Sequence, residues 1–180
     1  ILGCSNESAW GLTKSLWASD VHGLARHHTI QNNFSLNNRR FEDELAQVCR
    51  REGVSLIPYS PLAGGVLSGK YNDGAFPEGA RFSLYQHAPR RQQAMLHRFV
   101  NDKTLESTRR YQAIAAELGM SVVTMAIAWS KQHDFVASTI VGATTAEQVP
   151  ELLAAAEVTL SPEMLARIDT VSRELLYPMG

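Results

Sequence analysis

Three short β-type runs, each followed by a helical pattern, constrain the fold of this chain most strongly. The runs span Ile1–Cys4, Thr29–Asn33 and Val54–Pro58, and they begin 28 and 25 residues apart. Apolar residues at helical spacing predict a mainly helical stretch over Glu7–Leu24 and a helix over Arg39–Glu52. This alternation is typical of βα units in a parallel sheet, so the chain is predicted to be an α/β protein.

The alternation changes after the third run. Residues from Asn72 to about Arg90 are rich in Gly, Pro and Ser, which predicts a long loop on the ligand side of the sheet. Two helices are expected next, one ending at Gly119 and one capped by Ser121. A fourth strand is predicted over Val136–Val141. The last expected elements are a helix from about Thr145 to Ala156 and a helix opened by Ser161 and Pro162.

Pattern alone leaves two architectures open. An eight-stranded α/β barrel typically takes about 250 residues, whereas this chain has 180. Four βα units therefore form either half of such a barrel or a small open α/β sheet. The first run begins directly at Ile1 without an initiator Met and would leave an unpaired sheet edge, so we expect the chain to start inside a larger protein.

Composition argues against several classes of function. With 44% hydrophobic residues and a net charge of -1, the chain can form one core and has no long-range reason to bind nucleic acid or an anionic membrane. The apolar run Val122–Trp129 is too short to span a bilayer. Cys4 and Cys49 form no disulfide framework, and the histidines show no ligand spacing. A cytoplasmic protein with reduced thiols and no metal site is predicted.

The segment 54–71 carries the strongest signal for a ligand. Its sequence, VSLIPYSPLAGGVLSGKY, is a predicted buried strand followed by a sharp turn, a glycine pair and a lysine. Gly64 and Gly65 allow backbone amides to approach a ligand closely, and Lys70 can place a point charge on a phosphate. Alone, Lys70 would be a solvated surface residue. Together these residues predict an anion-binding turn at the carboxyl end of a strand.

Polar residues also follow the first two runs. Ser5 and Asn6 can either cap the next helix or bond a carboxamide ligand. Gln31, Asn32 and Asn33 are consecutive amides in a predicted buried strand, where each polar group needs a partner. At least one of them is expected to point toward a polar ligand or a loop.

Four segments resemble the aldo-keto reductases, in particular the branch with Tas-like enzymes and the β subunits of potassium channels. They are GCSN at 3–6, QNNFSLNNR at 31–39, YSPLAGGVLSGKY at 59–71 and STIVGATTAEQ at 138–148, in the order of the family. The resemblance favours a TIM (β/α)8 barrel of the aldo-keto reductase type. Residues 1–180 would be its carboxyl-terminal half, and the catalytic residues would lie upstream.

The resemblance implies an NADP(H)-dependent oxidoreductase that reduces an aldehyde or ketone by hydride transfer from nicotinamide. A tyrosine would be the general acid, assisted by lysine, histidine and aspartate, and none of these four is assigned in this chain. The isolated fragment is therefore expected to be inactive. The alternatives are a non-catalytic nucleotide-binding or regulatory subunit of the same fold, and an α/β domain complete at 180 residues. Substrate identity and oligomeric state are not predicted.

The resemblance also assigns residues that would bind the nicotinamide and the phosphates. Ser5, Asn6 and Gln31 match residues that hold the nicotinamide carboxamide. Tyr59 matches one that stacks on the nicotinamide ring, although a core aromatic with its hydroxyl at the rim is the alternative. The segment that crosses the pyrophosphate is matched by Ser60, Pro61, Leu62, Gly64 and Lys70.

Residues 142–151 follow the predicted fourth strand and have two interpretations. Free amides at a helix amino terminus attract anions. Thr145 and Gln148 are also spaced as a capping box, which would satisfy the same backbone without a ligand, and both can hold. By the resemblance, the adenosine half of the cofactor would contact Gly142, Thr144, Gln148 and Glu151.

Two further positions bear on cofactor affinity by the same resemblance. Arg81 matches the basic residue near the 2′-phosphate of NADP, for which the forked guanidinium is suited. Leu152 stands where relatives usually carry an asparagine that reaches the adenine. A leucine can pack against the base but cannot bond its edge, so weaker adenine binding is expected.

Overall fold

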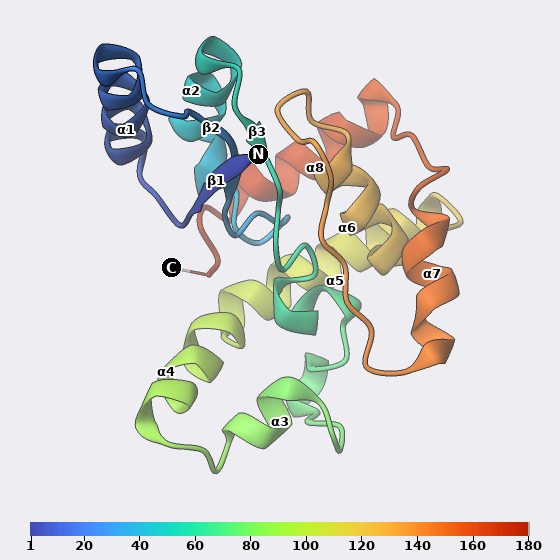
Figure 1. Ribbon diagram of the computed structural model, residues 1–180. Coiled ribbons are helices and arrows are strands. Elements are labelled where there is room, and N and C mark those ends of the chain that lie inside the picture. Colours follow the sequence, from blue (N-terminus) through green and yellow to red (C-terminus); the bar gives the residue numbers. More distant parts are fainter. Residues whose placement is uncertain (180) are drawn as a thin grey trace.

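A three-stranded parallel sheet organises the amino-terminal third of the chain (Figure 1). The computed structural model describes residues 1–179. The strands are β1 (Leu2–Ser5), β2 (His27–Gln31) and β3 (Ser55–Leu56), in that order across the sheet. Helices α1 (Ala9–His22) and α2 (Leu45–Glu52) connect them. The predicted α/β class and the parallel pairing of the three runs are confirmed.

The predicted fourth strand is wrong in extent. Val136 bridges Leu56 in parallel, and the Ala137 amide donates to the Leu56 carbonyl over 2.9 Å. Further on, the Ile140 amide donates to the carbonyl of Pro58 over 2.9 Å. Within the described segment 136–141 no regular strand forms. Pro58 has no N–H to return, so the ladder cannot continue on both sides of that residue.

Helices make up most of the remaining chain. Ser121 and Ser161 accept hydrogen bonds from the amides of Thr124 and Met164, as expected of the caps predicted there. The helix after Ser121 is buried almost all round. The helices are α3 (Arg81–Tyr85), α4 (Arg90–Phe99), α5 (Asp102–Glu117), α6 (Val122–Lys131), α7 (Val149–Ala154) and α8 (Pro162–Glu174), with short 3-10 turns η1 (Arg40–Glu42), η2 (Ala63–Ser68), η3 (Asn72–Gly74) and η4 (Ala146–Gln148).

The segment predicted as a loop from Asn72 to Arg90 is partly helical. It contains η3 and α3, and α4 begins at its end. The cause is Phe82, which is fully buried with its ring centroid 5.5 Å from that of Tyr71 and 5.2 Å from that of Phe99. A single aromatic anchor holds this stretch against the body of the protein, although its composition is typical of a loop.

Two predicted helices are divided in the structure. The stretch Arg39–Glu52 splits into η1 and α2, because Phe41 is buried while Arg39 and Glu42 bond each other beside it. The stretch 145–156 splits into η4 and α7. Pro150 lies in the first turn of α7, where its missing N–H costs no helical hydrogen bond.

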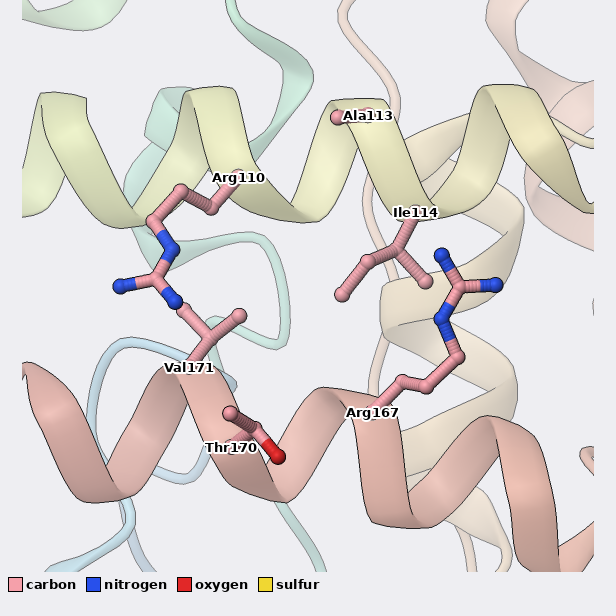
Figure 2. A pocket seen from close by; sticks show the side chains of 6 residues that line it. All are labelled: Arg110, Ala113, Ile114, Arg167, Thr170 and Val171. Atoms are coloured by element: carbon pink, nitrogen blue, oxygen red, sulfur yellow. The ribbon is translucent and has the colours of Figure 1, made fainter.

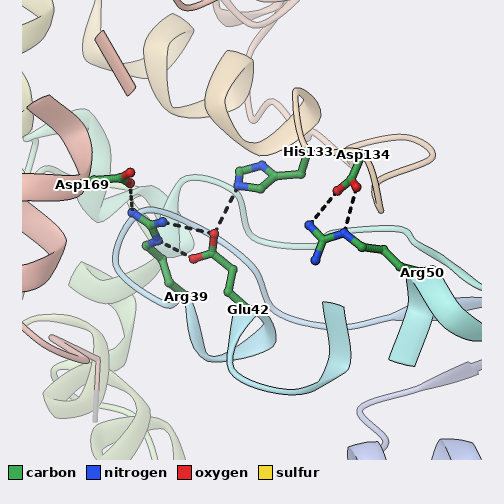
Figure 3. Close-up of polar contacts among 6 residues, drawn as sticks. All are labelled: Arg39, Glu42, Arg50, His133, Asp134 and Asp169. Atoms are coloured by element: carbon green, nitrogen blue, oxygen red, sulfur yellow. Dashed lines mark hydrogen bonds and ion pairs between the residues drawn. The ribbon is translucent and has the colours of Figure 1, made fainter. Parts of the chain in front are cut away.

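A polar network joins η1 to α8 and to the end of α6 (Figure 3). Arg39 donates from Nη2 to Glu42 over 3.1 Å and from Nη1 to Asp169 over 2.7 Å. Nε2 of His133 lies 3.3 Å from Glu42 Oε1. Burial raises the pKa of Glu42, but hydrogen bonds to His133 and Arg39 outweigh burial and leave that pKa below its ordinary value. The network therefore favours a charged Glu42.

Among residues 1–179, no single helix is both long and apolar enough to cross a bilayer. Helices α5 and α6 reach the required length and hydropathy only when taken together. They are bent by 96° relative to each other, and α6 is buried in the core.

Candidate functional site

One cavity of about 730 Å³ lies beside the turn that follows β3. It is lined by residues within 60–70 after β3, residues 77–81 at the start of α3, residues within 140–152 after the last sheet segment, and Val123 of α6. The segments that follow β3 and the last sheet segment thus meet at one cavity, as expected at the carboxyl ends of parallel strands in an α/β protein. Ten of the predicted cofactor residues line this cavity: Ser60, Pro61, Leu62, Gly64, Lys70, Arg81, Gly142, Thr144, Gln148 and Glu151.

The turn after β3 is held in an unusual backbone conformation. Ser60 and Ala63 have φ values of 55° and 50°, in the left-handed region that non-glycine residues rarely adopt. Hydrogen bonds from the Ala63 amide to the Ser60 carbonyl, 2.8 Å, and from the Gly65 amide to the Leu62 carbonyl, 2.9 Å, fix it. Such residues cost about 1–3 kcal/mol each and cluster at ligand sites. The turn therefore lines the cavity in a strained, hydrogen-bonded conformation.

The glycine pair in this turn also makes room for neighbouring side chains. A Cβ atom on Gly64 would lie 2.8 Å from the ring of Phe82, and one on Gly65 would lie 3.0 Å from Nζ of Lys70. The pair therefore makes room for these two side chains. By contrast, a Cβ on Gly142 would meet nothing within 4 Å, so Gly142 leaves open space at the cavity, as Gly79 does.

Lys70 and Arg81 give the cavity two cationic side chains. Neither forms an ion pair with a carboxylate among the described residues. Burial lowers the pKa of Lys70, and the nearby charge of Arg81 lowers it further. Glu78 and Glu151 also line the cavity without pairing to these cations. Two cationic side chains that form no ion pair remain free to bind a phosphate-bearing ligand.

Thr144 and Gln148, also in the lining of the cavity, are hydrogen-bonded to each other. The amide and hydroxyl of Thr144 donate to Oε1 of Gln148 over 2.9 and 3.3 Å. The predicted capping box is wrong, because the Gln148 oxygen is occupied by Thr144 and the Thr145 side chain makes no cap hydrogen bond. With its oxygen engaged, the Gln148 carboxamide has its NH2 group left for another acceptor.

The four predicted nicotinamide residues form a second cluster, at the carboxyl edge of the sheet. The Tyr59 hydroxyl donates to Asn6 Oδ1 over 2.7 Å, and Asn6 Nδ2 donates to the Ser5 hydroxyl over 3.0 Å. That hydroxyl in turn donates to the carbonyl of Gln31 over 3.0 Å. Neither Ser5 nor Asn6 caps α1; the cap is Ser8, so the capping interpretation is wrong. The structure thus joins residues from the ends of β1 and β2 to the one that follows β3.

The neighbouring amides are only partly satisfied. Asn33 accepts a hydrogen bond from Asn38 over 3.0 Å, and Asn32 donates to the backbone carbonyl of Glu7 over 3.3 Å. Within residues 1–179, Oδ1 of Asn32 is buried without a partner. An unpaired buried acceptor of this kind costs about 1–3 kcal/mol.

Sequence reasoning missed part of the cavity wall. Ile140 and Val141 precede Gly142 at the end of the predicted fourth strand. Because ligands bind at the carboxyl ends of parallel strands, this position could have identified them as lining residues. Val123 belongs to α6, whose apolar pattern predicted only core packing. The other lining residues without a predicted cofactor role are Ser68, Pro77, Glu78, Gly79, Ala80 and Thr145, and the lining also includes Gly65 and Leu152, which the sequence placed beside the ligand.

A smaller cavity of about 310 Å³ lies between α5 and α8 (Figure 2). Its two cations are neutralised, since Arg110 pairs with Glu174 and Arg167 pairs with Glu117. None of the predicted site residues reaches it. This cavity is lined by Arg110, Ala113, Ile114, Arg167, Thr170 and Val171.

Comparison with known proteins agrees with the sequence resemblance. Residues 1–173 match the sequence profile described as the Aldo/keto reductase family. Protein tas of Escherichia coli K12 is 40% identical over 177 residues, which are 98% of this chain and 49% of that protein. A probable voltage-gated potassium channel subunit beta of Arabidopsis thaliana is 34% identical over 94% of this chain and 51% of its own length.

A third relative carries a substrate in its name. L-glyceraldehyde 3-phosphate reductase of Escherichia coli O157:H7 is 33% identical over 141 residues, covering 77% of this chain and 40% of that protein. The chain spans about half the length of the curated relatives it matches. On the extent of these matches, the chain belongs to the aldo/keto reductase family, an oxidoreductase family with an α/β barrel fold.

Proposed function

We propose that this chain is the carboxyl-terminal, cofactor-binding half of a single NADP(H)-dependent aldo-keto reductase barrel. The observation that carries the proposal is the convergence of distant segments on one cavity with two cationic side chains that form no ion pair, Lys70 and Arg81. When bound, NADPH would supply the hydride that reduces a small aldehyde or ketone. The proposed compartment is the cytoplasm, since Cys4 and Cys49 are free thiols.

The cavity residues fit the polar parts of such a cofactor. Lys70 would supply a point charge to the pyrophosphate, and the fork of Arg81 would bind the 2′-phosphate. Gly142 leaves open space. The NH2 group of Gln148 would donate to the adenosine half, while Leu152 offers that half only an apolar surface.

The cluster at the sheet edge fits the nicotinamide end. The Tyr59 ring is anchored through its hydroxyl on Asn6, so it would present a fixed face for stacking. Ser5, Asn6 and Gln31 provide hydroxyl and amide groups for a carboxamide. Holding the nicotinamide in one orientation would lower the activation barrier for hydride transfer, because its freedom of movement is already restricted before the reaction. None of the residues proposed to bind the cofactor is proposed to donate the proton, so residues 1–180 alone are expected to be inactive.

The proposal is tested by titrating NADPH into the complete gene product. Replacing Lys70 with Met removes the charge and keeps the length of the side chain, so NADPH affinity should fall. Lys103→Met is the matched control, because Lys103 is an exposed lysine on α5 that does not line the cavity. Absence of saturable NADPH binding to the unaltered protein, or equal losses in both variants, would contradict the proposal.

A regulatory subunit is the second candidate. It is favoured by the relative named as a probable potassium channel subunit beta, which matches 94% of this chain. The two candidates differ in turnover. NADPH oxidation in the presence of small aldehydes supports the reductase, whereas tight NADPH binding without oxidation supports the regulatory subunit.

A further inference from the structure

A buried hydroxyl group lies at the start of the helix that begins with Arg81. Tyr71 is fully buried, and its hydroxyl accepts a 3.2 Å hydrogen bond from the backbone amide of Phe82. Phe82 is the second residue of α3, so this amide has no carbonyl within the helix to bind. The N-cap residue, Ala80, makes no side-chain cap hydrogen bond. Tyr71 therefore supplies an acceptor that the first turn of α3 lacks.

Tyr71 contacts both ends of the segment that leads to Arg81. Its ring centroid lies 5.8 Å from that of Phe76 and 5.5 Å from that of Phe82. Among residues 1–179, the backbone hydrogen bonds of residues 75–81 reach no further than four positions along the chain. Figure 1 shows α3 at the periphery of the molecule, away from the three-stranded sheet. The bond from Phe82 to Tyr71 therefore ties the end of this segment to a distant part of the chain.

The chain around Tyr71 is itself held by α5. Nδ2 of Asn72, the next residue, donates to Oε1 of Gln112 on α5 over 2.7 Å. Gly69 has a φ of 82° and leaves room for this contact, because a Cβ atom there would collide with the Gln112 side chain. Tyr71 thus lies between a contact to the long helix α5 and the first turn of α3.

Arg81 depends on its backbone for its position. It is exposed and forms no ion pair with a carboxylate among residues 1–179. Its carbonyl belongs to the same planar peptide group as the Phe82 amide that Tyr71 binds. Lys70, which directly precedes Tyr71, lines the same cavity as Arg81. Tyr71 thus connects the backbone at one cation to the backbone at the other.

We propose that Tyr71 is a positioning residue for recognition of the 2′-phosphate of NADP(H), which rests on the function proposed above. By accepting the Phe82 amide, its hydroxyl holds Arg81 in the lining of the cavity. Tyr71 is not a catalytic residue, since its side chain is fully buried and does not line the cavity. Burial raises the pKa of Tyr71, which keeps the hydroxyl neutral.

Cofactor titration of Tyr71→Phe in the complete gene product tests this role, because the variant loses the hydroxyl and keeps the packed ring. NADPH affinity should fall by about threefold to tenfold, the range that one hydrogen bond contributes to an equilibrium. NADH lacks the 2′-phosphate and should bind as before. Tyr111→Phe is the matched control, because Tyr111 is also buried and its hydroxyl donates to the Leu36 carbonyl over 3.4 Å, outside the cavity lining. The ratio of NADPH to NADH affinity should not change in this control.

The double variant Tyr71→Phe/Arg81→Met separates positioning from general destabilisation. If Tyr71 acts through Arg81, adding Tyr71→Phe to Arg81→Met should leave NADPH affinity unchanged. An unchanged affinity ratio in Tyr71→Phe, or a further loss of NADPH affinity in the double variant, would overturn the role of Tyr71 and leave NADPH binding by the cavity intact. Absence of saturable NADPH binding to the unaltered protein would overturn the proposed function, and the role of Tyr71 with it.

Discussion

The hydroxyl of Tyr59 donates a 2.7 Å hydrogen bond to Oδ1 of Asn6, a residue 53 positions earlier in the chain. This bond ties the turn after β3 to the end of β1 and spans the carboxyl edge of the sheet. Asn6 itself has a φ of 56°, so the contact holds a non-glycine residue in the left-handed region. The geometry fixes the aromatic ring that is proposed to stack on nicotinamide.

Substitution of Tyr59 should separate stacking from hydrogen bonding. Tyr59→Phe keeps the ring and loses one exposed hydrogen bond, which is worth about 0.5–1.5 kcal/mol, so NADPH affinity should change little. Tyr59→Ala removes the ring and should weaken NADPH binding clearly. Fluorescence titration of both variants checks this. Equal losses would show that the ring does not contact the cofactor.

Gly64 and Gly142 should respond differently to the same added methyl group. In Gly64→Ala, the methyl group would lie 2.8 Å from Phe82 at a φ of +66°, so the free energy of unfolding should fall by about 1–3 kcal/mol. In Gly142→Ala, the methyl group meets no neighbour, so stability should hold while NADPH binding weakens. Chemical denaturation and cofactor titration measure the two effects. A stable Gly64→Ala protein would contradict the packing argument.

Leu152→Asn should tighten NADPH binding and lower stability. The asparagine can bond the edge of the adenine, whereas the leucine cannot. Leu152 is only 7% exposed and packs in the core, and burial of a leucine contributes about 1.5–3 kcal/mol. The control is Leu153→Asn, at a neighbouring residue that is 60% exposed. An unchanged NADPH dissociation constant in Leu152→Asn would count against the proposed position of the adenine.

Glu42 should make the stability of the fold depend on acid pH. Its pKa in the folded state is below the ordinary value of 4.5, so it stabilises the protein above that value and the contribution is lost as pH falls through the folded pKa. Glu42→Gln should flatten the fall in unfolding free energy at low pH. Glu44→Gln, an exposed neighbour, serves as the control. Parallel pH profiles for Glu42→Gln and the unaltered protein would contradict the role of this network.

The features predicted best from the sequence are those that depend on residues close together in the chain. Ser121 and Ser161 cap their helices because the partner amide lies three residues away in the chain. Helix α3 was missed because Phe82 is anchored by residues on η2 and α4 that only the fold brings near. The capping box predicted at Thr145 does not form, because the side-chain oxygen of Gln148 accepts its hydrogen bond from the amide of Thr144.

Prediction of the cavity required knowing which residues far apart in the chain come together. Local sequence identified the turn at Lys70, but only the family resemblance joined it to Arg81 and Gln148, and the fold places all three in the lining of one cavity. That Gly64 and Gly65 also make room for Phe82 and Lys70 could not be predicted, because a glycine pattern does not say which side chains fill the space beside it.

The most direct measurement compares NADPH and NADH binding to the unaltered gene product and to Arg81→Met. The account predicts that NADPH affinity falls by about tenfold or more, as expected for loss of a charge-assisted hydrogen bond worth about 1.5–3 kcal/mol. NADH lacks the 2′-phosphate, so its affinity should stay the same. Equal changes for the two cofactors, or no change in either, would contradict the proposal that this cavity binds NADP(H).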